Sequence, residues 1–300
     1  MNVCTLCPRE CGADRRIPHS SFCGESERLT VSRAMLHMWE EPSISGKRGS
    51  GAIFFCGCNL RCVFCQNKTI SRGEGARHEL DEKGLETLML RLRDAGAQNI
   101  NLVTPTHFAD TVARVLERVK DKLMIPIVYN SSGYESVKTL KMLDGLIDVY
   151  LPDFKYASAE LALRYSGAPD YPTVAKDAVR EMFSQTGEAV FDGDGMIKKG
   201  VIVRHLVLPS CRKDSIAVLE LIAEALPIKD IRLSLMSQYT PKFALECEYK
   251  ELHRRVTSFE YRSVLERAVS LGFLGYFQER SSASEDYTPD FSQNDLLFGL

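Results

Sequence analysis

The sequence predicts an α/β fold in which short parallel strands alternate with helices. Two observations support this fold class: six apolar runs are each bounded by turn formers, and stretches with helical apolar spacing lie between them. The chain has 300 residues, 44% of them hydrophobic and 26% charged, which suits one barrel-sized domain or one domain with small extensions. A net charge of −2 gives no general attraction to nucleic acid or anionic membranes.

Each element is predicted from its own pattern. The first helix, over residues 81–95, has Leu85, Leu88, Met89 and Leu92 on one face and ends before Gly96. A second helix carries valines and leucine on one face over 112–119. The remaining helices are expected at 135–143, 157–164, 174–186, 215–225 and 259–270. Strands are expected at 53–55, 100–103, 124–129, 147–151, 201–208 and 231–236, with a hairpin at 191–195 and a short strand at 273–277.

Polar residues follow the predicted strands. The motifs are TPTH at 104–107, NSSG at 130–133, PDFK at 152–155, Arg204-His205, and SQY at 237–239. Each motif alone is explained by turn formation, since Asn, Ser and Gly favour turns without binding anything. If the strands form a barrel, however, their carboxyl ends converge on one mouth and these groups share a site. In a regular strand His205 would then point to the opposite face from Arg204.

A cysteine loop follows the first strand. Cys58, Cys62 and Cys65 have the spacing C-x3-C-x2-C. Three thiolates on one short loop can bind three corners of a cubane iron–sulfur cluster, leaving one iron open. The alternatives are three buried thiols or a zinc site. Cys56 precedes the loop on the strand and is interpreted as a packed thiol.

This loop resembles that of the radical S-adenosylmethionine (SAM) superfamily, because its spacing is accompanied by the aromatic Phe64 before the last cysteine. The wider stretch EEPSISGKRGSGAIFFCGCNLRCVFCQN, at 40–67, resembles uncharacterised homologues of the pyruvate formate-lyase activating enzymes. The resemblance implies a partial (β/α)6 TIM-like barrel, a [4Fe-4S] cluster and SAM. It also implies a one-electron reductant of the flavodoxin or ferredoxin type, and reductive cleavage of SAM to a 5′-deoxyadenosyl radical that abstracts hydrogen from a substrate.

The resemblance also implies roles for the residues that follow the strands. The backbone of 104–107 would contact the methionine amine, although TPTH replaces the glycine-rich stretch that many relatives carry there. The expected cofactor-binding residues are Phe64, Thr104, Thr106, His107, Asn130, Ser131, Asp153, Lys155 and Arg204. Of these, Asn130 and Ser131 would hold the ribose, and Asp153 and Lys155 the methionine carboxylate or the substrate. Arg204 could pair with a carboxylate through two hydrogen bonds. His107 and Arg204 are the candidates for a catalytic role.

A second cysteine group lies at the start of the sequence. Cys4, Cys7, Cys11 and Cys23 stand among the turn formers Pro8, Gly12, Pro18 and Gly24. A segment this short cannot build its own core, and four cysteines can bind a zinc ion that stabilises it. An additional iron–sulfur cluster is the competing interpretation, and the spacing does not choose between the two. Cys211 and Cys247 are expected to pack as small apolar residues.

These patterns predict a cysteine-rich extension and linker at 1–45, the radical SAM barrel at 46–280, and a tail at 281–300 that wraps the barrel surface. Ten cysteines and no apolar secretory segment favour a cytoplasmic protein with bound metal over a disulfide framework. The predicted function is hydrogen abstraction from a protein glycyl-radical site or a peptide. The alternatives are a small-molecule substrate, or an electron-transfer protein with no catalysis.

Overall fold

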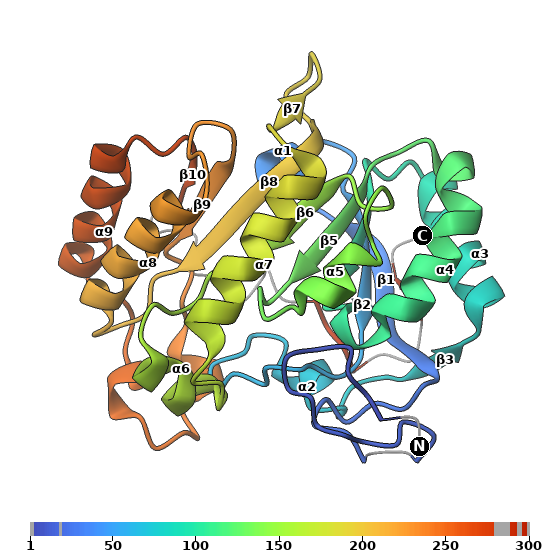
Figure 1. The fold of residues 1–300 in the computed structure, drawn as a ribbon, viewed down its shortest axis with the longest axis horizontal. Coiled ribbons are helices and arrows are strands. Elements are labelled where there is room, and N and C mark those ends of the chain that lie inside the picture. The colour runs from blue at the N-terminus through green and yellow to red at the C-terminus, as the bar shows by residue number, and fades with distance from the viewer. Residues whose placement is uncertain (1–2, 18–19, 279–288, 293–295, 299–300) are drawn as a thin grey trace.

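A parallel sheet forms the centre of the computed structural model, which describes residues 3–17, 20–278, 289–292 and 296–298 (Figure 1). Its six central strands are hydrogen-bonded side by side in the order of the chain, all parallel. They are β2 (Ser50–Phe55), β4 (Ile100–Val103), β5 (Ile127–Ser131), β6 (Val149–Pro152), β8 (Ile197–Leu206) and β9 (Arg232–Met236). This arrangement confirms the predicted partial barrel.

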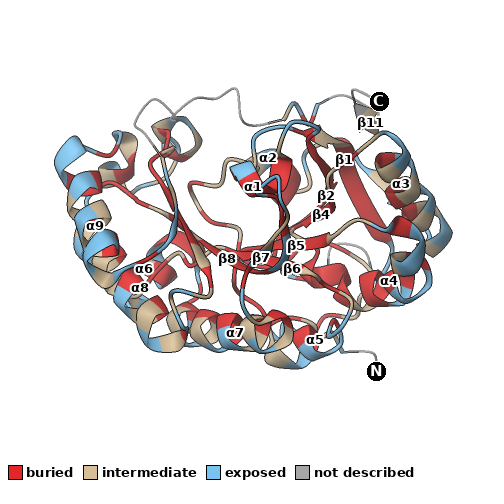
Figure 2. Cartoon of the chain, turned by 90° about the horizontal axis from the view of Figure 1, so that it is seen from above, coloured by how far each residue is buried: buried red, intermediate tan, exposed pale blue. Residues whose placement is uncertain are grey.

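Helices cover the outer face of the sheet (Figure 2). They are α3 (Glu82–Asp94), α4 (Ala109–Leu123), α5 (Val137–Lys141), α6 (Ala159–Ser166), α7 (Tyr171–Thr186), α8 (Arg212–Ala225) and α9 (Ser258–Leu271). On α4, the predicted face of Val112, Val115, Leu116 and Val119 is fully buried, because helical spacing places these side chains on one stripe. No described helix is both long enough and apolar enough to cross a membrane.

Two strand boundaries differ from the predicted ones. The strand expected at 124–129 is β5, Ile127–Ser131, because Met124 has a φ of 57° and ends α4 in the left-handed conformation. The strand expected from 201 begins earlier, at Ile197, because β7 (Val190–Phe191) pairs with it as the antiparallel partner of the predicted hairpin. The short strand β10 (Gly275–Phe277) forms as expected and extends the sheet beside β9.

The segment expected to be a packed linker contains a nine-residue strand, β1 (Leu29–His37). It pairs antiparallel with β2 and with β3 (His78–Leu80), and parallel with β11 (Leu297–Phe298). Both faces of β1 are largely buried, including the polar side chains of Thr30, Ser32 and Arg33. Much of the predicted surface tail, 281–288, 293–295 and 299–300, lies outside the described residues.

The short helix α1 (Pro42–Ser45) lies on the concave side of the sheet (Figure 2). Ile44 is fully buried there in one apolar cluster with Val128, Val149 and Ile202. Glu40 and Glu41 precede this helix and are therefore carried into the interior of the partial barrel. The remaining short helices are α2 (Lys68–Ser71) and the 3-10 turns η1 (Thr106–Phe108), η2 (Pro241–Ala244) and η3 (Lys250–His253).

Candidate functional site

A cavity of about 220 Å³ opens where the parallel strands end. The predicted strand-end groups and the cysteine loop meet in it, as expected for the carboxyl edge of such a sheet. Its wall includes the predicted residues Cys58, Cys62, Cys65, Phe64, Thr104, Asn130, Ser131, Asp153, Lys155 and Arg204. Thr106 and His107 do not contribute to this wall.

Left-handed backbone bends shape the cysteine loop. Gly57 has a φ of 79° and Arg61 a φ of 54°. At Gly57 a Cβ would lie 2.7 Å from the carbonyl oxygen of Cys23, so the turn has no room for a side chain. The bends aim backbone N–H groups at a sulfur: Cys58 Sγ accepts from the N–H of Leu60 at 3.3 Å. Hydrogen bonds to sulfur stabilise the thiolate form.

The other two loop cysteines are held by burial and by a side chain. Ser166 Oγ donates to Cys62 Sγ at 3.0 Å. Burial raises the pKa of Cys65 to about 12, so its thiolate needs a cationic partner. Three thiolate donors facing one cavity fit a [4Fe-4S] cluster with one open iron. Among the described residues no three Cys, His, Asp or Glu side chains, these included, meet at the spacing of a single metal ion.

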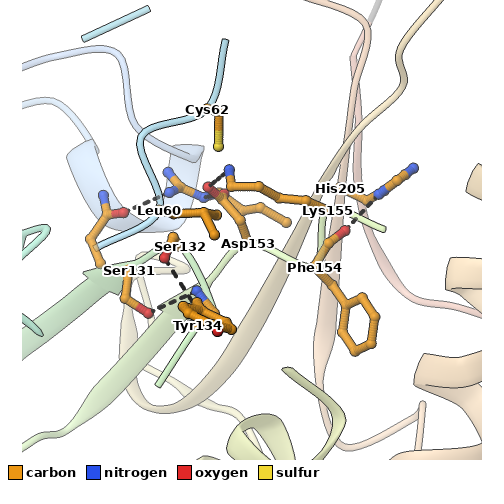
Figure 3. A network of polar contacts seen from close by, with 12 residues as sticks. Leu60, Cys62, Ser131, Ser132, Tyr134, Asp153, Phe154, Lys155 and His205 are labelled. Atoms are coloured by element: carbon orange, nitrogen blue, oxygen red, sulfur yellow. Dashed lines mark hydrogen bonds and ion pairs between the residues drawn. The ribbon is translucent and has the colours of Figure 1, made fainter. Parts of the chain in front are cut away.

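A charged network lies opposite the cysteine loop. Asp153 Oδ1 pairs with Arg204 Nε at 2.9 Å, and Asp153 Oδ2 with Lys155 Nζ at 2.6 Å. Figure 3 shows the Lys155 ammonium beside Asp153, with Cys62 above it. Burial opposes ionisation of Asp153, but Arg204 and Lys155 together hold its pKa below the ordinary value. Arg204 Nη2 donates to Asn130 Oδ1 at 2.6 Å, which ties two strand ends together.

Glu40 completes this network and was not predicted. Its carboxylate accepts from Asn101 Nδ2 at 3.1 Å and Asn130 Nδ2 at 3.2 Å, and it pairs with Arg204 Nη1 at 3.3 Å. Burial raises the pKa of Glu40, while Arg204 offsets part of that effect. Trp39 and His37, from the same segment, also line the cavity. The sequence carries no signal for this placement, because an acidic pair in a linker is usually solvated.

Of the TPTH turn, one residue lines the cavity and two make buried contacts outside it. Thr104 faces the cavity with a φ of 60°, and its N–H donates to Asn130 O at 2.8 Å. Thr106 Oγ1 instead donates to the buried Glu135 at 2.7 Å. His107 lies in the core, where its Nε2 bonds the carbonyl of Cys56 at 2.5 Å and burial lowers its pKa to about 3. The backbone-bonded geometry is that of a turn histidine.

The remaining predicted positions are distributed as follows. Phe64 is buried in edge-to-face contact with Tyr165 and Tyr239. His205 faces away from the cavity, as expected, and its Nδ1 bonds Phe154 O at 2.7 Å (Figure 3). Cys56 is packed and 1% exposed, and Cys211 is also buried.

The N-terminal cysteines are not equivalent. Cys7 and Cys23 are buried, Cys4 is half-buried, and Cys11 is exposed. No comparison or contact tests whether the four of them bind a metal, so that assignment stays a prediction.

Six parallel strands, with a three-thiolate loop and a charged cavity at their carboxyl ends, define a partial barrel built to hold a metal cluster. The sequence profile of the Radical SAM superfamily matches residues 52–199. An uncharacterised protein of Methanocaldococcus jannaschii is 30% identical over 276 residues, which cover 88% of this chain and 74% of that protein. The chain belongs to the radical SAM superfamily. It is therefore an enzyme, and the superfamily implies a [4Fe-4S] cluster and SAM.

One solved structure supports the fold. Streptococcus suis SuiB bound to S-adenosylmethionine superposes with a TM-score of 0.51 at 15% identity, over 76% of this chain and 52% of that one. Methylornithine synthase gives a TM-score of 0.48 at 17% identity, over 73% of this chain and 60% of that one. The chain thus spans little more than half the length of these structures. None of these comparisons shows the narrower resemblance to pyruvate formate-lyase activating enzymes.

Proposed function

We propose that this enzyme uses its cluster and SAM to abstract a hydrogen atom from a polypeptide. The observation that carries the proposal is the shared cavity, in which Cys58, Cys62 and Cys65 face the network of Asp153, Lys155 and Arg204. When bound, the cluster and SAM supply a one-electron reductive cleavage that gives methionine and a 5′-deoxyadenosyl radical able to take hydrogen from a substrate.

The protein's own part is to bind, orient and exclude water. The three loop thiolates would hold the cluster, and the neighbouring Lys155 and Arg204 would receive a carboxylate of SAM. Asn130 and Ser131 lie at the end of β5, where they would hold ribose hydroxyls. The backbone of Thr104 would serve the methionine amine. Because most of these side chains are buried before any ligand enters, their orientation is set in advance.

The substrate side of the cavity favours a polypeptide. Trp39 lines the cavity and is 59% exposed, and its neighbour Met38 is 43% exposed. Large apolar side chains at the edge of a cavity are typical of a surface that receives another chain. Installation of a glycyl radical on a partner enzyme is the most specific form of this proposal. It rests on the resemblance of residues 40–67 to activating-enzyme homologues.

An electron-transfer protein is the competing function. Such a protein needs a cluster and a docking surface for its redox partner, but no pocket of fixed charges beside the cluster. The pairing of Asp153 with two cations at the cavity wall therefore favours the enzyme. In either case an external one-electron reductant, of the flavodoxin or ferredoxin type, would deliver electrons to the cluster.

The test is electron paramagnetic resonance of the reconstituted, reduced protein with and without SAM, together with chromatographic detection of 5′-deoxyadenosine. We expect a cubane signal that changes on adding SAM, and 5′-deoxyadenosine that Cys62→Ala abolishes and Cys247→Ala does not. A cluster signal indifferent to SAM would refute the enzyme. Incubation with deuterated cell extract, separated into polypeptide and small-molecule fractions, tests the substrate class: deuterium should enter 5′-deoxyadenosine from the polypeptide fraction. Deuterium transfer only from the small-molecule fraction would contradict the proposed polypeptide substrate.

A further inference from the structure

The segment that precedes β1 docks directly on the cysteine loop of the barrel. Arg9 carries the contact: its Nε donates to Asn59 O at 2.8 Å, and its Nη2 donates to Leu60 O at 3.5 Å and to Ser166 O at 2.7 Å. Asn59 and Leu60 lie between Cys58 and Cys62, and Ser166 is the residue that donates to Cys62 Sγ. The Arg9 guanidinium therefore bonds two backbone segments. One is the loop between Cys58 and Cys62, and the other is the residue whose hydroxyl donates to Cys62 Sγ.

Arg9 stands in a turn bounded by two of the N-terminal cysteines, Cys7 and Cys11. The turn is bent by Glu10, with a φ of 41°, and by Gly12, with a φ of 65°. A non-glycine residue in this conformation is uncommon and persists only where its surroundings impose it. The position of Arg9 thus depends on whatever fixes this turn.

Cys23 shares a contact with a ligand of the barrel cluster. Ser21 Oγ lies 3.2 Å from Cys23 Sγ, as Ser166 Oγ lies 3.0 Å from Cys62 Sγ. Cys7 and Cys23 are buried and Cys4 is half-buried, all within one short segment. Four cysteines gathered in this way are the donor set of a zinc ion or an iron–sulfur cluster.

The segment has little regular structure of its own. Among its described residues, 3–17 and 20–28, the β-structure is a single bridge between Val3 and Asp14. Of its large apolar side chains, Val3 is 53% exposed and Ile17 is 57% exposed. Segments this small and this open are usually held by a metal or by disulfides, and the cysteines here are free.

We propose that Cys4, Cys7, Cys11 and Cys23 form a second metal site, which fixes Arg9 and so holds the cluster loop of the barrel in place. The metal is bound by four thiolates, as either a zinc ion or an iron–sulfur cluster. Cys11 is exposed, and among the described residues no three Cys, His, Asp or Glu side chains stand at the spacing of one metal ion, so binding would require Cys11 to turn toward the other three sulfurs. This proposal does not depend on the proposed function, because its readouts use no SAM.

Metal analysis of the triple variant Cys58→Ala, Cys62→Ala, Cys65→Ala tests the site. We expect this protein to retain about one zinc or about four irons per chain, the two being told apart by elemental analysis and visible absorption. Adding Cys7→Ser and Cys23→Ser should remove that metal, whereas adding Cys247→Ser, the matched control, should not. Equal metal content with and without Cys7 and Cys23 would overturn the proposal.

A measurement on the unaltered protein guards against variants that fail to fold. Mass spectrometry after brief alkylation should show Cys4, Cys7, Cys11 and Cys23 protected until a chelator is added. Unprotected Cys11 in metal-loaded protein would contradict the site as drawn. For the role of Arg9, Arg9→Ala should keep the second metal but lose the barrel cluster to a chelator at least several-fold faster. An unchanged rate would refute the proposed link to the cluster loop.

Discussion

Glu135 should make the protein less stable as the pH rises from 5 to 8. Its side chain is 1% exposed, and Thr106 Oγ1 and Tyr129 Oη donate to its two carboxylate oxygens at 2.7 and 3.3 Å. Burial raises the pKa of Glu135 from 4.5 to about 7, and no cation is among the causes that offset this. In the unfolded chain the Glu135 carboxyl ionises near its ordinary pKa of 4.5. Between that pKa and the folded pKa of about 7, the folded state therefore binds more protons than the unfolded state.

The sign and size follow from that difference. The stabilisation is complete below the unfolded pKa and is lost as the pH rises through the folded pKa. A difference of two to three pKa units corresponds to roughly 3 kcal/mol, of which about 2.5 kcal/mol should disappear between pH 5 and pH 8. The substitution Glu135→Gln keeps the shape and the acceptor for Thr106 but cannot ionise, so it should remove this component.

The assay compares urea unfolding of the wild type and Glu135→Gln at pH 5, 6, 7 and 8. The difference in unfolding free energy between them, and not either curve alone, isolates Glu135, because the buried His107 and His205, whose pKa values burial lowers, titrate in both proteins. Glu246→Gln, at an 82% exposed side chain, is the control. Infrared spectroscopy should show a protonated carboxyl band at pH 5 that is missing from the variant. A difference that stays constant with pH would refute the reasoning.

Three further predictions concern the cavity wall and residues packed behind it. Gly133→Ala should destabilise the fold by roughly 2–4 kcal/mol in thermal unfolding, because Gly133 has a φ of 73° and the added Cβ would lie 2.1 Å from Asp153 O; an unchanged melting temperature would contradict this. Lys155→Gln should weaken SAM binding by calorimetry about 10- to 100-fold, because it removes one of the two cations proposed to receive the SAM carboxylate and hydrogen bonds to charged groups contribute ~1.5–3 kcal/mol; unchanged affinity would argue against this network as the SAM site. Phe291→Ala should lower the free energy of unfolding by about 3 kcal/mol, because the centroid of its buried ring lies 5.3 Å from that of Phe54. Equal denaturation midpoints for the variant and the wild type would count against that packing.

The sequence predicted the elements whose periodicity reflects one buried face. Strand β4 and helices α3, α4 and α7 lie where their patterns indicated, within a few residues. Strand β1 was missed because polar residues such as Thr30, Ser32 and Arg33 are buried in it, whereas in a short segment between other motifs they are usually exposed. The start of β5 was misplaced because Met124 adopts a left-handed conformation, which nothing in its side chain favours.

The candidate site divides in the same way. Cysteine spacing and strand-end position were enough to predict that the loop and Asn130, Asp153, Lys155 and Arg204 meet at one cavity, because both depend on local order in the chain. Their roles toward the cluster and SAM stay predictions. Glu40 could not be found, since its place beside Arg204 depends on a chain path that crosses the concave face of the sheet. For Thr106 and His107 the position in the chain was correct but the direction of the side chain was not predictable.

The helix inside the barrel has a consequence for synthesis on the ribosome. Ile44 leaves the ribosome early, but one of the side chains it packs against, Ile202, is made 158 residues later. At about 5–20 residues per second the delay is roughly 8–32 s. For that interval the packing of the segment that will form the interior of the site stays incomplete in the nascent chain. It is therefore accessible to chaperones until the far half of the sheet has emerged.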